Sequence, residues 1–291
     1  MKRLLILALL VAVAGTVLYL GERYKAGGHV GPEGALNAAA ELQREVSRVP
    51  ARITRLSDQQ EMLAGDRMAQ QYSTTYSEAD APMQEYVSEV GRRVAAHARR
   101  KFTYKFHYIP ESYLVNAFAL PGGHIFIGKG LIDLMDSEDE MASVLGHEVE
   151  HVEHYHCNER ASIEAAARHL PLGGLIVLPI ELFQAGYNKE QELEADRDGT
   201  QLAVMAGYSP QGAIRMFQAF EKLEHQYVTK DETPDQEIPR VAIESITGYF
   251  RSHPLSAERE RQIKLLIVAQ KWPEPQEKPL KVSANQVAEE K

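Results

Sequence analysis

Two histidines four residues apart, His147 and His151, constrain the fold of this chain more than any other feature. A turn of α-helix takes about 3.6 residues, so both imidazoles lie on one helix face and can reach one metal ion. Zn²⁺ readily accepts imidazole nitrogen, and a catalytic zinc site uses three protein ligands and keeps one position for water. Glu148 lies about 100° round the helix from His147, where it can approach that water without being a ligand. The pattern therefore predicts a helix that carries two zinc ligands and a general base.

The residues around this pair specify the helix well. Ser137 with Glu140 three residues later is a capping-box signature. One apolar face follows at helical spacing, formed by Met141, Val144, Leu145, Val149 and Val152. Gly146 stands in mid-helix, where glycine costs about 1 kcal/mol relative to alanine, so it suggests close packing against another element. The alternative is a solvated helix face, because polar residues are dense from 147 to 156.

A catalytic site needs a third ligand, and the sequence limits where it lies. A metzincin would have glycine at 154 and histidine at 157, but this chain has His154 and Cys157. The remaining class takes a carboxylate from a downstream helix, and Glu192 and Asp196 lie one turn apart on one face. One can bind the metal while the other accepts a hydrogen bond from a ligand imidazole. Glu194 points elsewhere, and a plain charged surface helix is the alternative for this segment.

Four separated motifs together resemble a known family. They are Asn116-Ala-Phe-Ala-Leu-Pro-Gly-Gly-His124, the HExxH helix, Glu192-x-x-x-Asp196, and Ser252-His253-Pro254 with Arg259. In this order, over residues 55–268, the chain is similar to the HtpX/BepA-type zinc metallopeptidases, relatives of the CAAX prenyl proteases. The resemblance implies an α+β, mostly helical, zincin-like fold with a small β-sheet beside the HExxH helix. It points to the compact, soluble branch without a helical-repeat domain.

The resemblance also implies roles for single residues. The ligands of one Zn²⁺ per chain would be His147, His151 and Glu192. Glu148 would act as the base, and Asp196 would support a ligand histidine. The implied function is zinc-dependent endopeptidase activity of the gluzincin type on exported polypeptides, such as misfolded or unassembled envelope proteins. The alternative is a non-catalytic, chaperone-like or assembly factor that retains a zinc site.

The Ser-His-Pro motif leaves three roles open for His253. Together with Arg259, it is a candidate donor to the tetrahedral oxyanion. It could instead occupy the fourth zinc position and hold the enzyme inactive until substrate displaces it. A structural role for a histidine before Pro254 is the third alternative.

Strand-like segments at 102–109, 113–118 and 124–127 surround a Pro-Gly-Gly turn. Zinc peptidases typically hold the substrate extended along an edge strand by backbone hydrogen bonds. By the resemblance, residues 116–127 supply this edge, with substrate contacts at Asn116, Ala117, Phe118, Gly122 and Gly123. A plain structural hairpin is the alternative.

The remaining periodic segments predict helices at 35–46, 57–71, 83–99 and 210–223. The apolar run at 170–183 is broken by proline and glycine, so it is either a core helix or a mobile flap. Residues 231–239 read as a loop. The charged tail at 271–291 lacks apolar periodicity and is expected to be disordered.

The N-terminus reads as a targeting segment. Lys2 and Arg3 precede an uncharged apolar run at 4–20. This run is longer than a usual signal-peptide core and shorter than the about 20 residues of a spanning helix. It is either a cleaved signal peptide or an anchor at a membrane surface, and both place the chain in the periplasm or on the periplasmic face of the inner membrane. The predicted division is a targeting segment (1–25), a linker with a helix (26–55), a peptidase domain (56–270) and the tail.

Composition excludes two other classes. The net charge is −9 and no basic patch stands out, so nucleic-acid binding has no support. Cys157 is the only cysteine, so no intramolecular disulfide framework holds the fold. The 291 residues are enough for one sizeable domain with a buried core.

Overall fold

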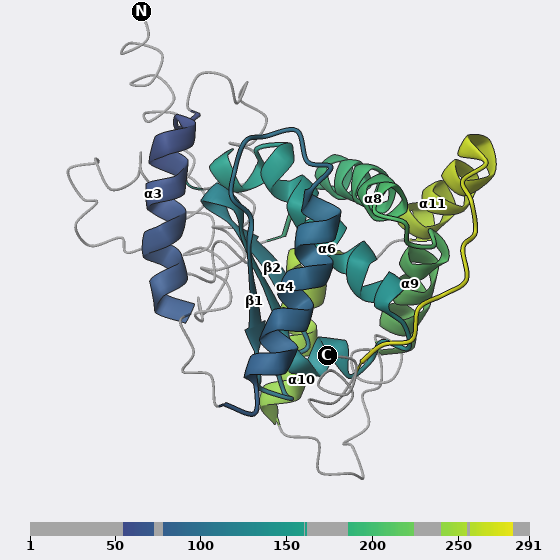
Figure 1. The fold of residues 1–291 in the computed structure, drawn as a ribbon, viewed down its shortest axis with the longest axis horizontal. Helices are drawn as coiled ribbons and strands as arrows, with labels where there is room; N and C mark the ends of the chain where they lie inside the picture. The colour runs from purple at the N-terminus through teal and green to yellow at the C-terminus, as the bar shows by residue number, and fades with distance from the viewer. Residues whose placement is uncertain are drawn as a thin grey trace, which may run out of the picture.

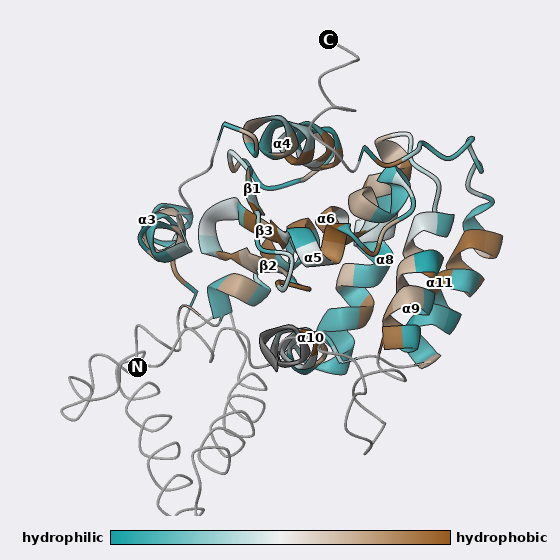
Figure 2. Ribbon diagram, turned by 90° about the horizontal axis from the view of Figure 1, so that it is seen from below, coloured by the Kyte–Doolittle hydropathy of each residue, from teal (hydrophilic) through white to brown (hydrophobic). Residues whose placement is uncertain are grey.

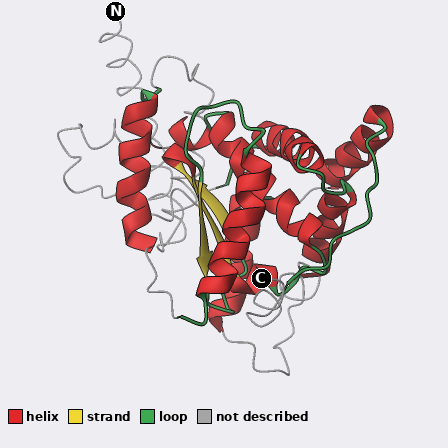
Figure 3. Cartoon of the chain, viewed as in Figure 1, coloured by secondary structure: helices red, strands yellow, loops and turns green. Residues whose placement is uncertain are grey.

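The computed structural model describes residues 55–72, 78–159, 161, 186–223, 240–254 and 257–281. The predicted targeting segment, the helix at 35–46, the apolar run at 170–183 and the loop at 231–239 lie outside these residues. Among the described residues, no helix is both long enough and apolar enough to cross a bilayer. This part of the chain is mostly helical, with one small mixed sheet, as the predicted fold class requires (Figure 3).

Helix α6 (Glu138–Glu153) carries the HExxH segment and runs through the centre of the fold (Figure 1). All of its residues are buried, so the alternative of a solvated polar face is wrong. The Ser137 hydroxyl accepts a hydrogen bond from the Glu140 N–H, as predicted. The Glu140 carboxylate accepts from the Asp136 N–H rather than completing the capping box, and it also pairs with Arg215.

The sheet has the order β1-β3-β2. Strand β1 (Lys105–Ile109) runs parallel to β3 (His124–Gly128), and β2 (Ala117–Leu120) runs antiparallel to it. One face packs on α6 and on α4 (Ala81–Ala95), and the other on α3 (Asp58–Ala69). In Figure 2 the strands and α6 carry hydrophobic colour in the interior, whereas α3 is mainly hydrophilic.

Two strand predictions need correction. The strand expected at 113–118 lies instead at Ala117–Leu120, because residues 112–116 form a turn and loop in which the Leu114 N–H bonds to the Glu111 carbonyl. The strand expected from residue 102 begins at Lys105. Between β2 and β3, the predicted turn is the short 3₁₀ helix η3 (Pro121–Gly123). Gly122 and Gly123 both have positive φ, of 74° and 89°, which favours glycine there.

The downstream helices complete the domain. Helix α8 (Lys189–Met205) begins at an Asn188–Gln191 capping box. The others described are α5 (Lys129–Ile132), α9 (Gln211–Leu223), α10 (Arg240–Ser252) and α11 (Ala257–Gln270), with η2 (Gln70–Tyr72) after α3. Helices α3 and α9 match the predictions at 57–71 and 210–223, and α4 ends earlier than predicted, at Ala95.

Two glycines bring α6 and α8 into close contact. A Cβ on Gly146 would lie 2.6 Å from the Gly199 carbonyl oxygen, and a Cβ on Gly199 would lie 2.6 Å from the His147 nitrogen. This confirms the close packing expected at Gly146. The small separation places the α8 carboxylates beside the α6 histidines.

The tail is not disordered between Lys271 and Lys281, and the prediction is wrong for these residues. The Glu138 N–H donates to the Lys278 carbonyl (2.9 Å), and the Lys278 N–H donates to Asp139 Oδ2 (2.9 Å). Leu280 is buried in the main core cluster. The segment is ordered because its Lys278 carbonyl satisfies one of the orphan backbone donors at the start of α6 and its Lys278 N–H bonds to Asp139. Apolar periodicity does not reveal such contacts. Residues 282–291 lie outside the described part.

Glu61 joins three parts of the fold through one buried carboxylate. It pairs with Arg100 Nη2 at 2.6 Å, and it accepts hydrogen bonds from the Asn158 amide and the Gly122 N–H. Arg100 also donates to the Val152 carbonyl at 2.7 Å. Both charges of the pair are buried, so removing one leaves an uncompensated charge inside the protein.

Replacing Glu61 with alanine is expected to lower the free energy of unfolding by about 3–5 kcal/mol, because the Arg100 charge loses its buried partner. Asp58→Ala is the matched control, since Asp58 pairs with the same guanidinium at 2.8 Å but has 61% of its side chain exposed. It should cost no more than about 1 kcal/mol. Urea unfolding of the two variants measures the difference, and equal losses would contradict the assigned role of Glu61.

Candidate active site

The two histidines of the HExxH segment meet as the helical spacing predicts. His147 Nε2 and His151 Nε2 are 3.0 Å apart, and both side chains are buried. Their rings are nearly perpendicular, at 83°, with centroids 4.6 Å apart. The two nitrogens therefore converge on one point beside α6.

Glu192 on α8 reaches the same point. Its Oε1 lies 3.5 Å from His151 Nε2, and its Oε2 lies 3.6 Å from His147 Nε2. The side chain is almost completely buried, at 1% exposure, on the helix that the Gly146–Gly199 contact holds against α6. The plain charged surface helix proposed as the alternative is wrong for this residue.

His253 joins the group from the end of α10. Its Nδ1 lies 3.2 Å from His147 Nε2 and 3.2 Å from Glu192 Oε1. Its Nε2 lies 3.5 Å from Glu148 Oε1. The ring is 1% exposed, and the backbone N–H donates to the Tyr249 carbonyl, so the histidine continues the last turn of the helix. Sequence spacing could not place it here, since it is 106 residues from His147.

The donor set fits a zinc ion. Ligands about 2.0–2.1 Å from zinc in a tetrahedron lie about 3.3–3.4 Å from one another. Five of the six residue pairs among His147, His151, Glu192 and His253 have donor atoms between 3.0 and 3.6 Å apart, and one ligand atom from each residue lies within 4.8 Å of all the others. Three imidazoles and one carboxylate are also ligand types that zinc prefers.

Asp196 and Arg259 support this group from one side. Asp196 Oδ1 lies 3.0 Å from His147 Nδ1, and Arg259 makes two bonds to the Asp196 carboxylate, at 2.6 and 2.7 Å. Arg259 Nη1 also lies 2.8 Å from Glu192 Oε2 and donates to the Pro254 carbonyl at 3.0 Å. Burial by itself would raise the pKa of Asp196, but the nearby guanidinium and imidazole hold that pKa below its usual value. The carboxylate therefore stays charged and can fix the His147 tautomer.

His156 contacts the site in a way that sequence reasoning missed. Its Nδ1 lies 2.9 Å from His151 Nδ1. Helix α6 has already ended there, and Tyr155 adopts a positive φ of 65°, which turns the chain so that His156 meets His151. A left-handed tyrosine has no sequence signal. Glu194, expected to point elsewhere, lies 3.6 Å from His156 Nε2 and so reaches the site indirectly.

Two tyrosines were also missed. The Tyr187 ring stacks on His151, with centroids 3.6 Å apart and 13° between the planes. Tyr249 lies one turn before His253 on α10, with ring centroids 5.1 Å apart. Burial and the nearby charge of Glu148 raise the pKa of Tyr249 well above its usual value, so its hydroxyl remains protonated.

A second group of possible metal ligands, Glu150, His154 and Asp198, is engaged in ion pairs. His154 Nε2 lies 2.7 Å from Asp198 Oδ2 and 3.2 Å from Glu150 Oε2, and these carboxylates also pair with Arg197 and Arg99. Hydrogen bonds from Asp198 and Glu150 raise the pKa of His154 to about 9. The histidine is therefore a cation at neutral pH, which suits an ion pair rather than a metal ligand.

The predicted substrate edge lies beside α6 but divides into two parts. The Asn116 carbonyl accepts from the Gly128 N–H (2.9 Å), so strand alternation directs the backbone groups of Ala117 and Ala119 to the outer edge of β2. The Phe118 side chain lies on the other face of the sheet from those of Ala117 and Ala119, and there it stacks on Phe126. The turn at 122–123 packs against α3 instead, since a Cβ on Gly122 would meet the Met62 backbone. The structure does not bring these two glycines to the group of His147, His151, Glu192 and His253.

The comparison with known families decides the identity, because the profile of "Peptidase family M48" matches residues 81–267. The chain belongs to peptidase family M48. The matched region contains α6, α8, α10 and every residue of the ligand group described above. The family agrees with the resemblance predicted from the four motifs.

The chain is also similar to individual M48 peptidases. It is 30% identical to the beta-barrel assembly-enhancing protease of Yersinia pestis over 198 residues, which is 60% of this chain and 40% of that protein. It is 27% identical to the mitochondrial metalloendopeptidase OMA1 of Schizosaccharomyces pombe, over 68% of this chain and 55% of that protein. Metalloprotease LoiP of Escherichia coli is 26% identical over 88% of this chain and 95% of that protein. The chain thus spans less than half of the first relative's length.

Proposed function

We propose that this M48 chain is a zinc-dependent endopeptidase. The observation that carries the proposal is the convergence of His147, His151 and Glu192 at ligand spacing, with the buried Glu148 carboxylate 3.5 Å from Nε2 of the neighbouring His253. A purely structural zinc site needs no base, so Glu148 argues for catalysis. A zinc ion held by these residues would supply Lewis-acid chemistry to a peptide carbonyl and to water.

The residues of the chain would transfer the proton and hold the ligands in position. Glu148 would accept the proton from the attacking water and pass it to the leaving amine as a general base and then a general acid. Asp196 would keep His147 in the tautomer that presents Nε2, because it accepts at Nδ1. Arg259 would act as a positioning residue. Its bonds to Asp196, Glu192 and Pro254 favour this role over the predicted one of oxyanion donor.

For His253 we favour the role of fourth ligand in the resting enzyme. Its Nδ1 is as close to His147 Nε2 and Glu192 as the other donors are to one another. A catalytic zinc site needs one position for water, so a fourth protein ligand would block it. Substrate would then have to displace His253. The Tyr249 hydroxyl, which remains protonated, is a candidate donor to the oxyanion.

Replacing His253 with alanine separates these roles by the sign of the effect. If His253 closes the site, the variant should cleave a small unstructured peptide faster than the wild type does. An oxyanion donor would instead lower kcat by roughly 10²–10³-fold when it is removed. Initial rates at saturating peptide measure the difference. An unchanged rate would reject both roles and leave His253 as a structural residue.

The substrate class and location remain part of the proposal. Relatives named for β-barrel assembly support exported envelope proteins as substrates, in the periplasm or on the periplasmic face of the inner membrane. The apolar run at 4–20 supports export and a place at the membrane surface.

Metal content and casein cleavage, measured on the same preparation, test the proposed function. We expect about one zinc per chain, cleavage that disappears when a chelator removes the metal, and recovery when zinc is added back. A zinc-loaded chain that binds casein without cleaving it would overturn the proposal in favour of a chaperone-like protein. Cleavage by a zinc-free chain would overturn it as well.

A further inference from the structure

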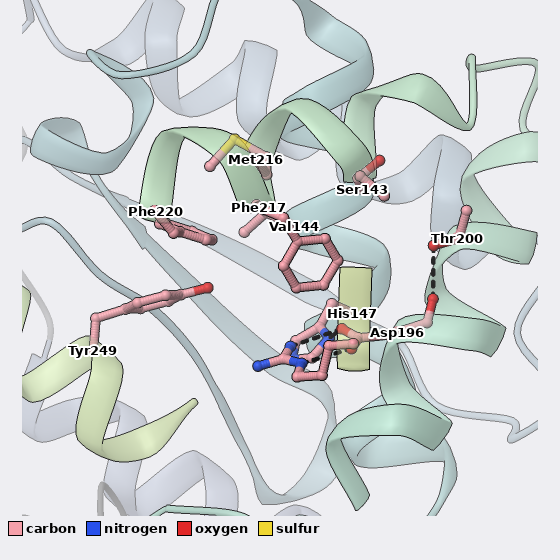
Figure 4. Close-up of a pocket in the computed structure, with 11 residues that line it drawn as sticks. Ser143, Val144, His147, Asp196, Thr200, Met216, Phe217, Phe220 and Tyr249 are labelled. Atoms are coloured by element: carbon pink, nitrogen blue, oxygen red, sulfur yellow. Dashed lines mark hydrogen bonds and ion pairs between the residues drawn. The ribbon is translucent and has the colours of Figure 1, made fainter. Parts of the chain in front are cut away.

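The two histidines of α6 differ in what holds the ring nitrogen that faces away from the ligand group. The Nδ1 of His147 lies 3.0 Å from a carboxylate oxygen of Asp196, which Figure 4 shows beside the imidazole. The Nδ1 of His151 instead lies 2.9 Å from the Nδ1 of His156. A histidine that binds a metal almost always donates its other N–H to a fixed acceptor, which sets the tautomer and the orientation of the ring. For His151 the structure places a second imidazole at that position.

The contacts of this pair determine where its protons lie. His151 directs Nε2 towards His147 Nε2 at 3.0 Å and Glu192 Oε1 at 3.5 Å, so zinc would bind at Nε2 and leave the proton on Nδ1. The Nδ1 of His156 must then accept, and the proton of His156 is on its Nε2. The Glu194 carboxylate lies 3.6 Å from that Nε2, and its negative charge favours a proton there. The three side chains thus form a chain from the ligand to the surface.

The histidine pair is closed to water. His151 is 0% exposed and His156 is 4% exposed. The ring of Tyr187 covers both, since its centroid lies 3.6 Å from that of His151 and 5.7 Å from that of His156. A buried N–H without an acceptor is destabilising, because it has lost water and gained nothing in return. The His151 N–H therefore depends on a protein acceptor.

The backbone just before His156 is strained, and its surroundings hold it in place. Tyr155 has a φ of 65°, which is uncommon for a residue with a Cβ. The guanidinium carbons of Arg55 and Arg100 each lie 4.0 Å from the centre of its ring. A left-handed residue other than glycine persists where the rest of the structure imposes it, and such residues concentrate at functional sites. The consequence here is the contact of the next residue with His151.

Asn158 fixes the other side of the same turn. Its amide oxygen accepts from the Leu56 N–H at 3.0 Å, and its amide nitrogen donates to the Leu56 carbonyl at 3.1 Å and to Glu61. The side chain is 0% exposed. His156 thus lies between two anchored residues, and its backbone position is fixed from both sides.

We propose that His156 is a positioning residue for the zinc ligand His151, and that Glu194 orients His156 in turn. The inference rests on the proposed zinc peptidase function and adds to it the group that holds the second HExxH histidine. Helical spacing by itself separates Glu194 from the ligands. The side chain acts through an imidazole that lies beyond the end of α6.

Two variants of similar shape test the hydrogen bond at Nδ1. Asparagine places an oxygen acceptor close to the position of the histidine Nδ1, whereas leucine has the same branched shape and no acceptor. His156→Leu should weaken zinc binding by about 10–100-fold, and His156→Asn should keep most of the wild-type affinity. Glu194→Ala should give a smaller loss than His156→Leu, because it acts through one further ring. Competition with a chromophoric chelator measures the zinc affinity of each protein.

His107→Ala is the matched control for these variants. The Nε2 of His107 lies 3.0 Å from the Nδ1 of His124, so it makes the same kind of contact, but on β1 and outside the ligand group. Its removal should leave zinc affinity unchanged. Urea unfolding of the metal-free proteins separates a change in affinity from a change in the fold. If His156→Leu does not fold, His156→Ala takes its place, since alanine also removes the acceptor.

The outcomes separate this inference from the function on which it rests. If the wild type binds zinc and cleaves casein, equal affinity in the leucine and asparagine variants, whether high or low, overturns the positioning role and leaves the peptidase function standing. A loss in His107→Ala as large as that in His156→Leu overturns it as well, and wild-type affinity in Glu194→Ala removes Glu194 from the chain. A wild type that binds no zinc contradicts both proposals. Weak binding in the leucine variant alone, with the asparagine variant and the control close to the wild type, supports the role of His156.

Discussion

Replacing Glu148 with glutamine is expected to lower peptide hydrolysis by roughly 10²–10⁴-fold while the fold and the bound zinc remain. Glutamine has nearly the same shape, so the buried position beside His253 stays filled. It cannot accept the proton from the attacking water, and that is the only function removed. Single-turnover cleavage of a fluorogenic peptide, with zinc content measured on the same sample, checks the result.

Glu150→Gln is the matched control for this experiment. Glu150 lies on the same helix and is also buried, but its carboxylate pairs with Arg99 and His154 rather than with the proposed zinc ligands. The same chemical change there should leave hydrolysis close to the wild-type rate. If Glu148→Gln cleaves as fast as Glu150→Gln with full zinc occupancy, Glu148 is not the base.

Replacing Glu192 with alanine is expected to reduce bound zinc well below one per chain. The carboxylate is the non-histidine member of the converging donors, and its oxygens lie 3.5 and 3.6 Å from the two histidine nitrogens. The change should not leave a buried charge alone, because Arg259 keeps both bonds to Asp196. Metal analysis after dialysis against a weak chelator measures the loss.

Glu190→Ala is a better control for this experiment than Glu194→Ala. Glu190 is exposed in the same first turn of α8, whereas Glu194 contacts His156 and so reaches His151. Zinc content should not change in Glu190→Ala. Asp196→Ala should fall between the two, since partners of ligand residues typically contribute about 10–100-fold to metal affinity. Equal zinc in the Glu192 and Glu190 variants would remove Glu192 from the ligand set.

Local sequence patterns predicted the elements that depend on neighbouring residues. The helix predicted from residue 57 forms behind a Ser57–Gln60 capping box, and the apolar period around the HExxH segment gives a continuous buried helix. Strand boundaries were less accurate, because the backbone hydrogen bonds of residues 111–115 form a turn that alternating polarity does not reveal. The prediction of a disordered tail was wrong as far as Lys281, because the hydrogen-bond partners of this segment lie at the start of α6, far away in the chain.

In the candidate site, too, local patterns could be predicted from the sequence and distant contacts could not. Helical periodicity by itself determined that His147 and His151 share a face and that Glu192 and Asp196 share another, because residues four apart are neighbours on any helix. Only the tertiary structure decided that Glu192 meets the Nε2 atoms of both histidines, whereas Asp196 meets Nδ1 of His147. That choice depends on the Gly146–Gly199 contact, which sets the distance between the two helices.

The contributions of His253, Arg259 and His156 were likewise decided by packing. His253 and Arg259 reach the site across more than sixty residues of chain, from α10 and α11, and His156 does so through a left-handed Tyr155. Such contacts depend on how separate helices pack and on a single backbone angle, and neither has a periodic signature in the sequence. The sequence alone therefore determined the chemistry that the chain can carry, and the tertiary structure decided how its side chains are arranged around the proposed metal site.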